Sequence, residues 1–223
     1  MVMRMDFTDK DYIENYLAGL IRFPETPTML EMRRQAEKEG YPIIRPAVAA
    51  FLNVLVNSKK PTSALEIGTS IGYSGLLILQ AMGTNGRLIS VESSEDLLES
   101  ARENFKKQGV ANQVTLIAGD GGDVLNHLDD TFGLIFLDGP KAQYLSYLPD
   151  CIRLLEHGGL LVCDDVLFYG MVAKDELIHR RKITIVKRMR KFLRTLVDYP
   201  GLDTAIVPIG NGISVSVKKE ADL

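Results

Sequence analysis

The chain has 223 residues, of which 46% are hydrophobic and 25% are charged, with 26 basic and 29 acidic residues. A chain of this length fits one domain with additions, and it can bury enough surface to fold without disulfides or a structural metal. Two cysteines are too few for a disulfide scaffold. No stretch approaches the about 20 apolar residues of a membrane span, so we expect a globular protein of the cytoplasm with no membrane partner.

The first 60 residues are predicted to form helices that precede the main fold. Apolar residues recur at helical spacing between positions 8 and 21, which predicts one helix there. A second helix is expected to end at Gly40 and a third to begin at Pro46, because glycine and proline are typical of these positions. We therefore expect a helical N-terminal addition over 1–60 to a core that spans 61–223.

Seven short apolar runs follow residue 61, and the first five alternate with helix-like segments. They read SALEIG, GRLISVE, VTLIAGD, GLIFLD, GLLVCDD, DTAIVPIG and GISVSVKK. This alternation predicts a Rossmann-like α/β fold, doubly wound around a mostly parallel seven-stranded sheet. A short turn at Asn211-Gly212 separates the last two runs and is a strong hairpin signal, so one strand near the C-terminus should be antiparallel. We expect a single domain over residues 1–223.

Ligands of such sheets bind beyond the carboxyl ends of the strands, so the residues after each strand are candidates for a site. After the first run, Gly68 allows a tight turn and Gly72 allows close approach of a ligand. Ser70 stands where a dinucleotide fingerprint has its middle glycine, which argues against a dinucleotide oxidoreductase. Glu66 adds a carboxylate suited to an amino or cationic group. A plain strand-to-helix turn is the alternative interpretation.

Acids also follow the second and third runs. Glu92 ends the second run, 24 residues after Gly68, where a carboxylate can accept from ribose hydroxyls. A solvated acid near a helix start is the alternative for Glu92. Asp120 lies in the segment Gly119-Asp120-Gly121-Gly122 and can accept from an adenine amino group. It can also cap the following helix, and both roles are compatible.

Three carboxylates follow the fourth and fifth runs, namely Asp138, Asp164 and Asp165. Acids placed directly after parallel strands converge at one sheet edge, where three oxygen donors suit a hard divalent cation such as Mg²⁺. Helix capping is the alternative for each acid. Lys141 lies three residues after Asp138. A nearby cation lowers the pKa of a lysine, so Lys141 is a candidate general base, and an ordinary surface lysine is the alternative.

Residues 180–194 carry eight Lys or Arg and no acid. Without this block, 18 basic residues face 29 acidic ones. On one long helix, the cations could contact several phosphates of an anionic partner such as RNA. A solvated helix face is the alternative. The candidate RNA-binding residues are Arg180, Arg181, Lys182, Lys187, Arg188, Arg190 and Lys191.

The motifs ALEIGTSIGYS, SVE, AGD, FLDGPKAQY and VCDDV together resemble the metal-dependent class I S-adenosylmethionine-dependent O-methyltransferases, the branch with catechol and caffeoyl-CoA O-methyltransferases. The resemblance implies S-adenosylmethionine as cofactor, and Mg²⁺ or another divalent cation on Asp138, Asp164 and Asp165. It implies catalytic roles for Lys141 and Asp138. The family usually has Asp-Asn where this chain has Asp164-Asp165, which adds negative charge. The cofactor-binding residues implied are Ile43, Glu66, Gly68, Thr69, Ser70, Gly72, Tyr73, Ser74, Glu92, Asp120, Gly121 and Asp138.

The C-terminal sequence HRRKITIVKRMRKFLRTLVDYPGLDTAIVPIGNGISVSVKK, after DDVLFYGMV, is similar to the bacterial tRNA 5-hydroxyuridine methyltransferases. This likeness implies methylation of a wobble uridine in the tRNA anticodon to 5-methoxyuridine. The alternative is the same chemistry on a small catechol-like or acyl-CoA phenolic acceptor. A noncatalytic cofactor- or RNA-binding protein is a remote alternative, against which the intact Asp138 and Lys141 argue. Likeness to the family also favours a homodimer.

Overall fold

The computed structural model describes residue 16, residues 19–21 and residues 25–220. The helix expected over 8–21 therefore lies largely outside the described residues. No helix in the described part of the chain is long and apolar enough to cross a membrane.

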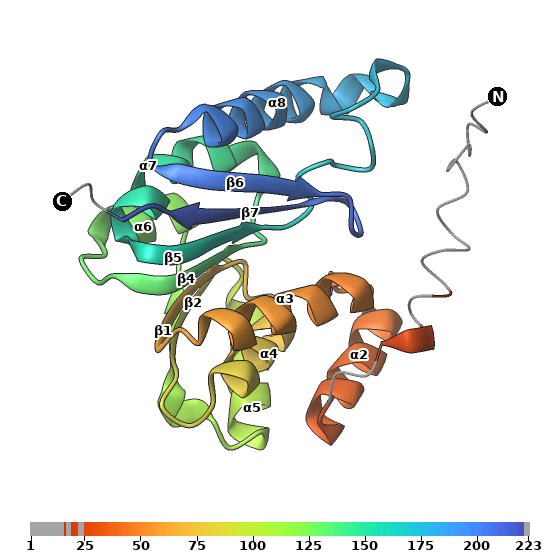
Figure 1. Cartoon of the computed structure of the whole chain (residues 1–223). Helices are drawn as coiled ribbons and strands as arrows, with labels where there is room; N and C mark the ends of the chain where they lie inside the picture. Colours follow the sequence, from red (N-terminus) through yellow and green to blue (C-terminus); the bar gives the residue numbers. More distant parts are fainter. Residues whose placement is uncertain (1–15, 17–18, 22–24, 221–223) are drawn as a thin grey trace.

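A seven-stranded sheet with the order β3-β2-β1-β4-β5-β7-β6 forms the centre of the fold (Figure 1). All strands run parallel except β7, which pairs antiparallel with both β5 and β6. The predicted α/β class, strand number and single antiparallel strand are confirmed. The strands are β1 (Ser63–Ile67), β2 (Arg87–Glu92), β3 (Val114–Ala118), β4 (Phe132–Leu137), β5 (Leu155–Cys163), β6 (Leu202–Val207) and β7 (Ile213–Lys218).

Helices cover both faces of the sheet and divide the core in two (Figure 1). One face packs against α2 (Pro27–Glu39), α3 (Pro46–Lys59), α4 (Tyr73–Met82) and α5 (Glu95–Lys107). The other packs against α6 (Gly121–His127), α7 (Tyr144–Leu154) and α8 (Ile183–Asp198). Short 3₁₀ turns lie at η1 (Ala111–Gln113), η2 (Lys141–Gln143), η3 (Asp175–Leu177) and η4 (Arg180–Lys182). Adjacent residues of β1 enter opposite cores, Ala64 the first and Leu65 the second, which explains the continuous apolar run.

Local signals set the ends of the N-terminal helices, and those at Gly40 and Pro46 were predicted. The Thr26 side chain accepts from the Met29 backbone N–H at 3.2 Å and caps α2. Gly40 ends α2 in the left-handed conformation, with φ of 73°. Pro46 is the first residue of α3. The chain between these two helices, residues 41–45, is short and irregular.

The β6–β7 hairpin forms, but its connection is longer than the predicted Asn211-Gly212 turn. Val207 pairs with Ile213, so five residues, 208–212, join the strands. The carbonyls of Asn211 and Gly212 accept from the backbone N–H groups of Leu167 and Val166. The longer connection thus gains partners in the loop that follows β5, a tertiary contact that no local pattern reveals.

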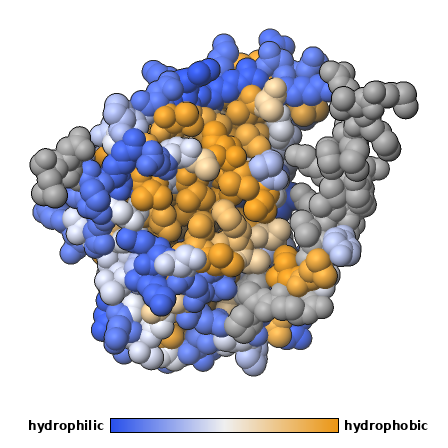
Figure 2. All heavy atoms as spheres, viewed as in Figure 1, coloured by the Kyte–Doolittle hydropathy of each residue, from blue (hydrophilic) through white to orange (hydrophobic). Residues whose placement is uncertain are grey.

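A broad apolar surface lies where β6 and β7 extend past α3 (Figure 2). Val54 and Val217 are exposed there, and Phe51, Val207 and Val215 are partly buried. The helices that cover β6 and β7 lie on the opposite face of the sheet. The expected homodimer stays a prediction.

The packing of α8 on the second core generates a stability prediction. Phe192 has no exposed surface, and its ring lies edge-to-face with Tyr144 at a centroid distance of 5.5 Å. Phe192→Ala should lower the free energy of unfolding by about 3–5 kcal/mol, because it leaves a cavity. Val197→Ala on the same helix, where the side chain is 51% exposed, should change it by no more than about 0.5 kcal/mol. Denaturant unfolding measures both, and equal losses would contradict the assigned core.

Candidate active site

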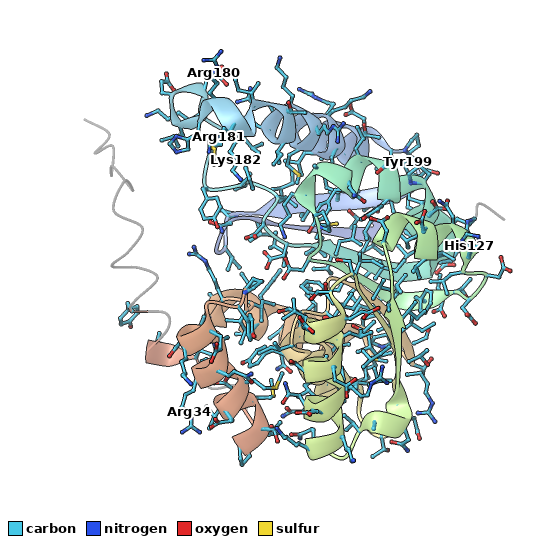
Figure 3. All side chains as sticks on the ribbon, turned by 180° about the vertical axis from the view of Figure 1, so that it is seen from behind. Arg34, His127, Arg180, Arg181, Lys182 and Tyr199 are labelled. Carbon is cyan, nitrogen blue, oxygen red and sulfur yellow. The ribbon has the colours of Figure 1, made fainter. Side chains whose placement is uncertain are left out.

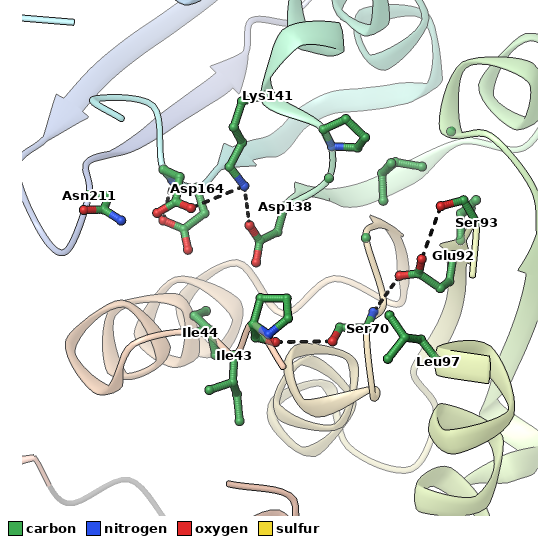
Figure 4. A pocket seen from close by; sticks show the side chains of 18 of the residues that line it. Ile43, Ile44, Ser70, Glu92, Ser93, Leu97, Asp138, Lys141, Asp164 and Asn211 are labelled. Carbon is green, nitrogen blue, oxygen red and sulfur yellow. Dashed lines mark hydrogen bonds and ion pairs between the residues drawn. The ribbon is translucent and has the colours of Figure 1, made fainter. Parts of the chain in front are cut away.

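A cavity of about 530 Å³ opens beyond the carboxyl ends of the strands, where the sheet order reverses between β1 and β4. The loops after β1 to β5 line it, and the 42–45 segment closes one side (Figure 4). The predicted residues that line this cavity are Ile43, Gly68, Ser70, Glu92, Asp120, Gly121, Asp138, Lys141, Asp164 and Asp165. The fold therefore brings together, beyond the carboxyl ends of the strands, predicted site residues from five separate loops.

The glycine loop after β1 is held by contacts on several sides. Gly68 has φ of 101°, and a Cβ on it would lie 2.7 Å from the Asp138 carbonyl oxygen, so only glycine fits without displacement. The Ser70 backbone N–H donates to a Glu92 carboxylate oxygen at 2.9 Å. The Asn104 side chain of α5 donates to the Ile71 carbonyl at 3.0 Å. The loop is thus ordered by the protein alone.

Glu92 and Asp120 combine structural contacts with positions on the cavity. The second oxygen of Glu92 accepts from the Ser94 backbone N–H at 3.0 Å. Asp120 accepts from the Gly122 backbone N–H at 2.8 Å and is the N-cap of α6. Capping and a place on the cavity wall therefore coincide at Asp120. The ribose and adenine roles of these acids stay predictions.

Five predicted cofactor residues do not line the cavity but stand behind the loop that does, namely Glu66, Thr69, Gly72, Tyr73 and Ser74. Glu66 is fully buried and accepts hydrogen bonds from the hydroxyls of Ser74 and Ser90. Thr69 is hydrogen-bonded to the same Ser90. The motif spacing identified the loop, but the side chains of Glu66, Thr69 and Ser74 support it from within the core.

Burial raises the pKa of Glu66 to about 7, although the hydrogen bonds from Ser74 and Ser90 oppose the shift. The nearby charges of Asp138 and Glu92 raise it further. Glu66 therefore keeps its proton up to about neutral pH, as expected for a carboxyl group buried among the apolar residues of the sheet.

Two of the three carboxylates contact one ammonium group, and the third, Asp164, lies beside them (Figure 4). Lys141 Nζ lies 2.7 Å from Asp138 Oδ1 and 3.5 Å from Asp165 Oδ2. Asp164 Oδ1 accepts from the Asp165 backbone N–H at 2.7 Å. The predicted convergence of strand-end acids with Lys141 is therefore present as a contact network.

The charges of this cluster are not balanced. Burial raises the pKa of Asp164 to about 7, and repulsion from Asp138 and Asp165 adds to the shift. Burial also raises the pKa of Asp138 despite its contact with Lys141. Burial alone lowers the pKa of Lys141, but the surrounding carboxylates outweigh it and raise the pKa. Lys141 is thus an ammonium as the residues stand, and full ionisation of the three acids leaves more negative charge than Lys141 balances.

The cluster has the donor chemistry of a divalent-cation site, because hard carboxylate oxygens and uncompensated negative charge favour such an ion. Its present arrangement differs from an assembled site, since the Lys141 ammonium lies close to both Asp138 and Asp165. Among the described residues, no group of three or more acidic, histidine or cysteine side chains is arranged to hold a metal ion. The metal ligands therefore stay predictions.

Sequence reasoning missed several residues of the site. Tyr144, fully buried, donates to the Leu137 carbonyl at 2.9 Å and to that of Asp164 at 3.3 Å, so it joins two strand ends. Tyr169 lines the cavity with 63% of its surface exposed and φ of 57°. Both residues lie in motifs that carry the family resemblance, Tyr144 at the end of FLDGPKAQY and Tyr169 within DDVLFYGMV, but no role was predicted for either side chain.

The basic block is divided between η4 and α8, whereas one long helix was expected. Six of its candidate residues are exposed, namely Arg180, Arg181, Lys182, Lys187, Arg188 and Lys191. Arg190 differs, because its guanidinium donates to the Val172 carbonyl at 2.9 Å and pairs with Asp175 at 2.5 Å. It anchors the chain that follows the carboxylate loop.

The buried carboxyl group generates a pH prediction. Below about pH 4.5, Glu66 is protonated in both folded and unfolded chains. Between pH 4.5 and about 7 the unfolded chain loses this proton first, so Glu66 progressively destabilises the folded state as the pH rises. Glu66→Gln should remove this loss, worth about 3 kcal/mol above pH 7. Denaturant unfolding of both proteins from pH 4.5 to 8 tests it.

The exposed Glu103 on α5 provides the matched control. Glu103→Gln should leave the pH profile of the free energy of unfolding unchanged. A constant difference between wild type and Glu66→Gln across this pH range would contradict the raised pKa.

Comparison with known proteins places this geometry in a family. A family pattern described as O-methyltransferase matches residues 22–219. A Mycobacterium ulcerans protein provisionally named an O-methyltransferase is 30% identical over 188 residues, which cover 83% of this chain and 82% of the relative. A Staphylococcus aureus crystal structure, provisionally named a caffeoyl-CoA O-methyltransferase, is 27% identical with a TM-score of 0.86, covering 93% of this chain and all of the other.

A Bacillus cereus O-methyltransferase solved with S-adenosylhomocysteine (SAH) shares the fold at a TM-score of 0.81 and 24% identity, over 93% of this chain and 97% of the other. The matched region contains the glycine loop and the carboxylate cluster together. The chain belongs to the O-methyltransferase family, the one that includes caffeoyl-CoA O-methyltransferases.

Proposed function

We propose that the protein transfers a methyl group from S-adenosylmethionine to the hydroxyl of a small catechol-like or acyl-CoA phenolic acceptor, with the help of a divalent cation. The observation that carries the proposal is one cavity in which the glycine loop faces the cluster of Asp138, Lys141 and Asp164. A volume of about 530 Å³ is in the usual range for small-molecule sites. Membership of the O-methyltransferase family supports the reaction class.

The cofactor half of the cavity fits S-adenosylmethionine in its chemistry. Gly68 and Gly121 have no room for a Cβ, since it would collide with Asp138 and Ile67 respectively, so the backbone itself forms the wall. Glu92 and Asp120 present carboxylates on that wall, which suit ribose hydroxyls and an adenine amino group. Binding of S-adenosylmethionine or SAH by proteins of the same fold supports this assignment.

The acceptor half combines the carboxylate cluster with a flat aromatic side chain. Asp138, Asp164 and Asp165 would hold the cation, for which their oxygens and excess charge are suited. When bound, a divalent cation supplies positive charge that lowers the pKa of the acceptor hydroxyl and of Lys141. Tyr169 at the cavity edge offers a ring against which a planar acceptor can stack.

The proposed reaction depends mainly on how the two reactants are positioned, and it needs no covalent intermediate with the enzyme. With a cation bound and its pKa lowered, Lys141 would accept the hydroxyl proton. The acceptor oxygen then forms a bond to the methyl carbon while the carbon–sulfur bond breaks, and sulfur keeps the electron pair. Since the two reactants approach with opposite charge, holding them in line and excluding water supplies much of the acceleration.

A methyl-transfer assay tests the proposal. With labelled S-adenosylmethionine and Mg²⁺, we expect label in 3,4-dihydroxybenzoate or caffeoyl-CoA, and none when a chelator is in excess. Lys141→Met should lower kcat by about 10²–10⁴-fold, the usual contribution of a proton-transfer group, while the Kd for SAH stays within about twofold of wild type, because Lys141 is assigned to the acceptor half of the cavity.

Lys106→Met at the exposed end of α5 is the matched control and should retain wild-type rates. Full activity in chelator would end the metal assignment. A normal rate for Lys141→Met would reject its proton-transfer role.

A second acceptor is favoured by one observation, the exposed cations of η4 and α8. Arg180, Arg181 and Lys182 make up η4, just before α8 (Figure 3), and all three are exposed. Such a surface suits the phosphates of a tRNA anticodon arm. The hydroxyl and neighbouring carbonyl of 5-hydroxyuridine resemble a catechol in their paired oxygens, so wobble methylation to 5-methoxyuridine is the second candidate function.

Charge reversal decides whether the basic face binds RNA. Changing Arg180, Arg181, Lys187 and Arg188 to Glu should weaken binding to tRNA that carries 5-hydroxyuridine and flatten its salt dependence. The control reverses four cations elsewhere, namely Arg34, Arg102, Lys106 and Lys107. If the variant and the control bind tRNA with equal affinity, the basic residues of 180–194 form a solvated helix face and do not bind RNA. In the methyl-transfer assay, label found only in the hydroxylated tRNA would identify tRNA, and not a small phenol, as the acceptor.

A further inference from the structure

We propose that Arg33, Glu25 and Tyr73 form a clasp through which helix α2 positions the cofactor loop and the neighbouring cavity wall for S-adenosylmethionine binding. These three residues are called the α2 clasp below. The inference rests on the proposed function for the identity of the ligand. It assigns positioning roles to Arg33 and Glu25, which the sequence patterns did not single out.

The α2 clasp is a closed set of polar contacts. The Arg33 guanidinium donates to the Tyr73 hydroxyl at 2.5 Å and to the Glu25 carboxylate at 3.0 Å. The Tyr73 hydroxyl donates to the same Glu25 oxygen at 2.5 Å. The guanidinium carbon also lies 4.9 Å from the centre of the Tyr73 ring. Charge-assisted bonds of this kind are stronger than neutral ones and fix the relative position of the groups they join.

The contacts of the α2 clasp bear on the cavity because Tyr73 lies at the end of the glycine loop. Tyr73 is the first residue of α4, directly after Gly72, and it is buried. It therefore marks the end of the glycine loop that lines the cavity through Gly68 and Ser70. Movement of Tyr73 shifts the end of this loop and the start of α4 together.

A second contact joins the chain that follows α2 to the glycine loop. The Ser70 hydroxyl donates to the Pro42 carbonyl at 3.2 Å, and Pro42 to Arg45 line the cavity. Only Gly40 and Tyr41 separate α2 from this wall. The glycine loop is thus held at its middle by the wall and at its end by α2, so the α2 clasp fixes the loop and the wall to each other.

Ordinary packing of α2 is the competing explanation. Met29, Met32 and Ala36 are buried against the first core and attach the helix without help from polar groups. If packing alone positions α2, loss of the α2 clasp changes stability but not the affinity for the cofactor. The two explanations therefore differ in a binding measurement.

Calorimetric titration of SAH into the full chain makes this measurement. Arg33→Ala and Tyr73→Phe should each raise Kd by about five- to tenfold, because each removes bonds to a charged group. The double variant should raise Kd by less than the product of the two single effects, because both changes remove the shared bond between Arg33 and Tyr73. In steady state, KM for S-adenosylmethionine should rise more than kcat falls.

Arg34→Ala is the matched control. Arg34 is the next residue of α2, and its side chain is 70% exposed. It contacts Glu31 and the Leu30 carbonyl on its own helix and points away from the fold (Figure 3). It should leave Kd within twofold of wild type. Arg33→Lys keeps the charge but not the forked geometry, so it should restore part of the affinity.

The outcomes separate the possible failures. Wild-type Kd in Arg33→Ala, with wild type itself binding SAH, overturns the α2 clasp. Absence of SAH binding by the wild type contradicts the proposed function instead. If Arg33→Ala no longer unfolds in one cooperative transition, Tyr73→Phe decides, since it removes a single hydroxyl: a raised Kd supports the clasp and a wild-type Kd overturns it.

Discussion

The site depends on backbone hydrogen bonds that continue past the ends of the strands. The Asp138 N–H donates to the Ile67 carbonyl and the Asp164 N–H to the Leu137 carbonyl, both at 2.9 Å. The first residue beyond each strand is therefore fixed by the neighbouring strand. The side chains that carry the chemistry begin at these fixed points, so the sheet itself sets their spacing.

Close backbone contact joins the two halves of the cavity. Gly68 packs directly against the carbonyl of Asp138, where no side chain fits. Buried polar groups then support the loop from behind, with Glu66 at the centre and Ser74 and Ser90 as its partners. The cofactor loop and the carboxylate cluster cannot shift independently, because they share this contact. A fully buried acid beneath them costs stability, which is a common feature of functional sites.

The sequence predicts the fold and the centre of the site because both follow from strand ends. Alternating apolar runs place Asp138 and Asp164 at one edge, and the short step from Asp138 brings Lys141 to it. The direction of each side chain is harder to predict. Tyr73 and Glu66 belong to the loop motif yet point into the core, since a motif specifies backbone shape and not orientation.

Tertiary partners account for most of what the sequence does not reveal. Arg190 is one cation among eight, and only the fold brings it to Asp175 and the Val172 carbonyl. Asn104 and Tyr144 lie in amphipathic helices, and their hydrogen-bond partners are backbone carbonyls. Such contacts have no characteristic spacing. They can be found only when the strand order has placed the helices over particular loops.

The composition of the cavity wall has a consequence for turnover. The charged residues that line it are Arg45, Glu92, Asp120, Asp138, Lys141, Asp164 and Asp165, so acids outnumber cations. The sulfur of the proposed methyl donor is positively charged before the reaction and neutral after it. An acidic wall stabilises the charged form more than the neutral one. Without a bound cation, the electrostatics of this wall therefore favour the charged donor over the spent one.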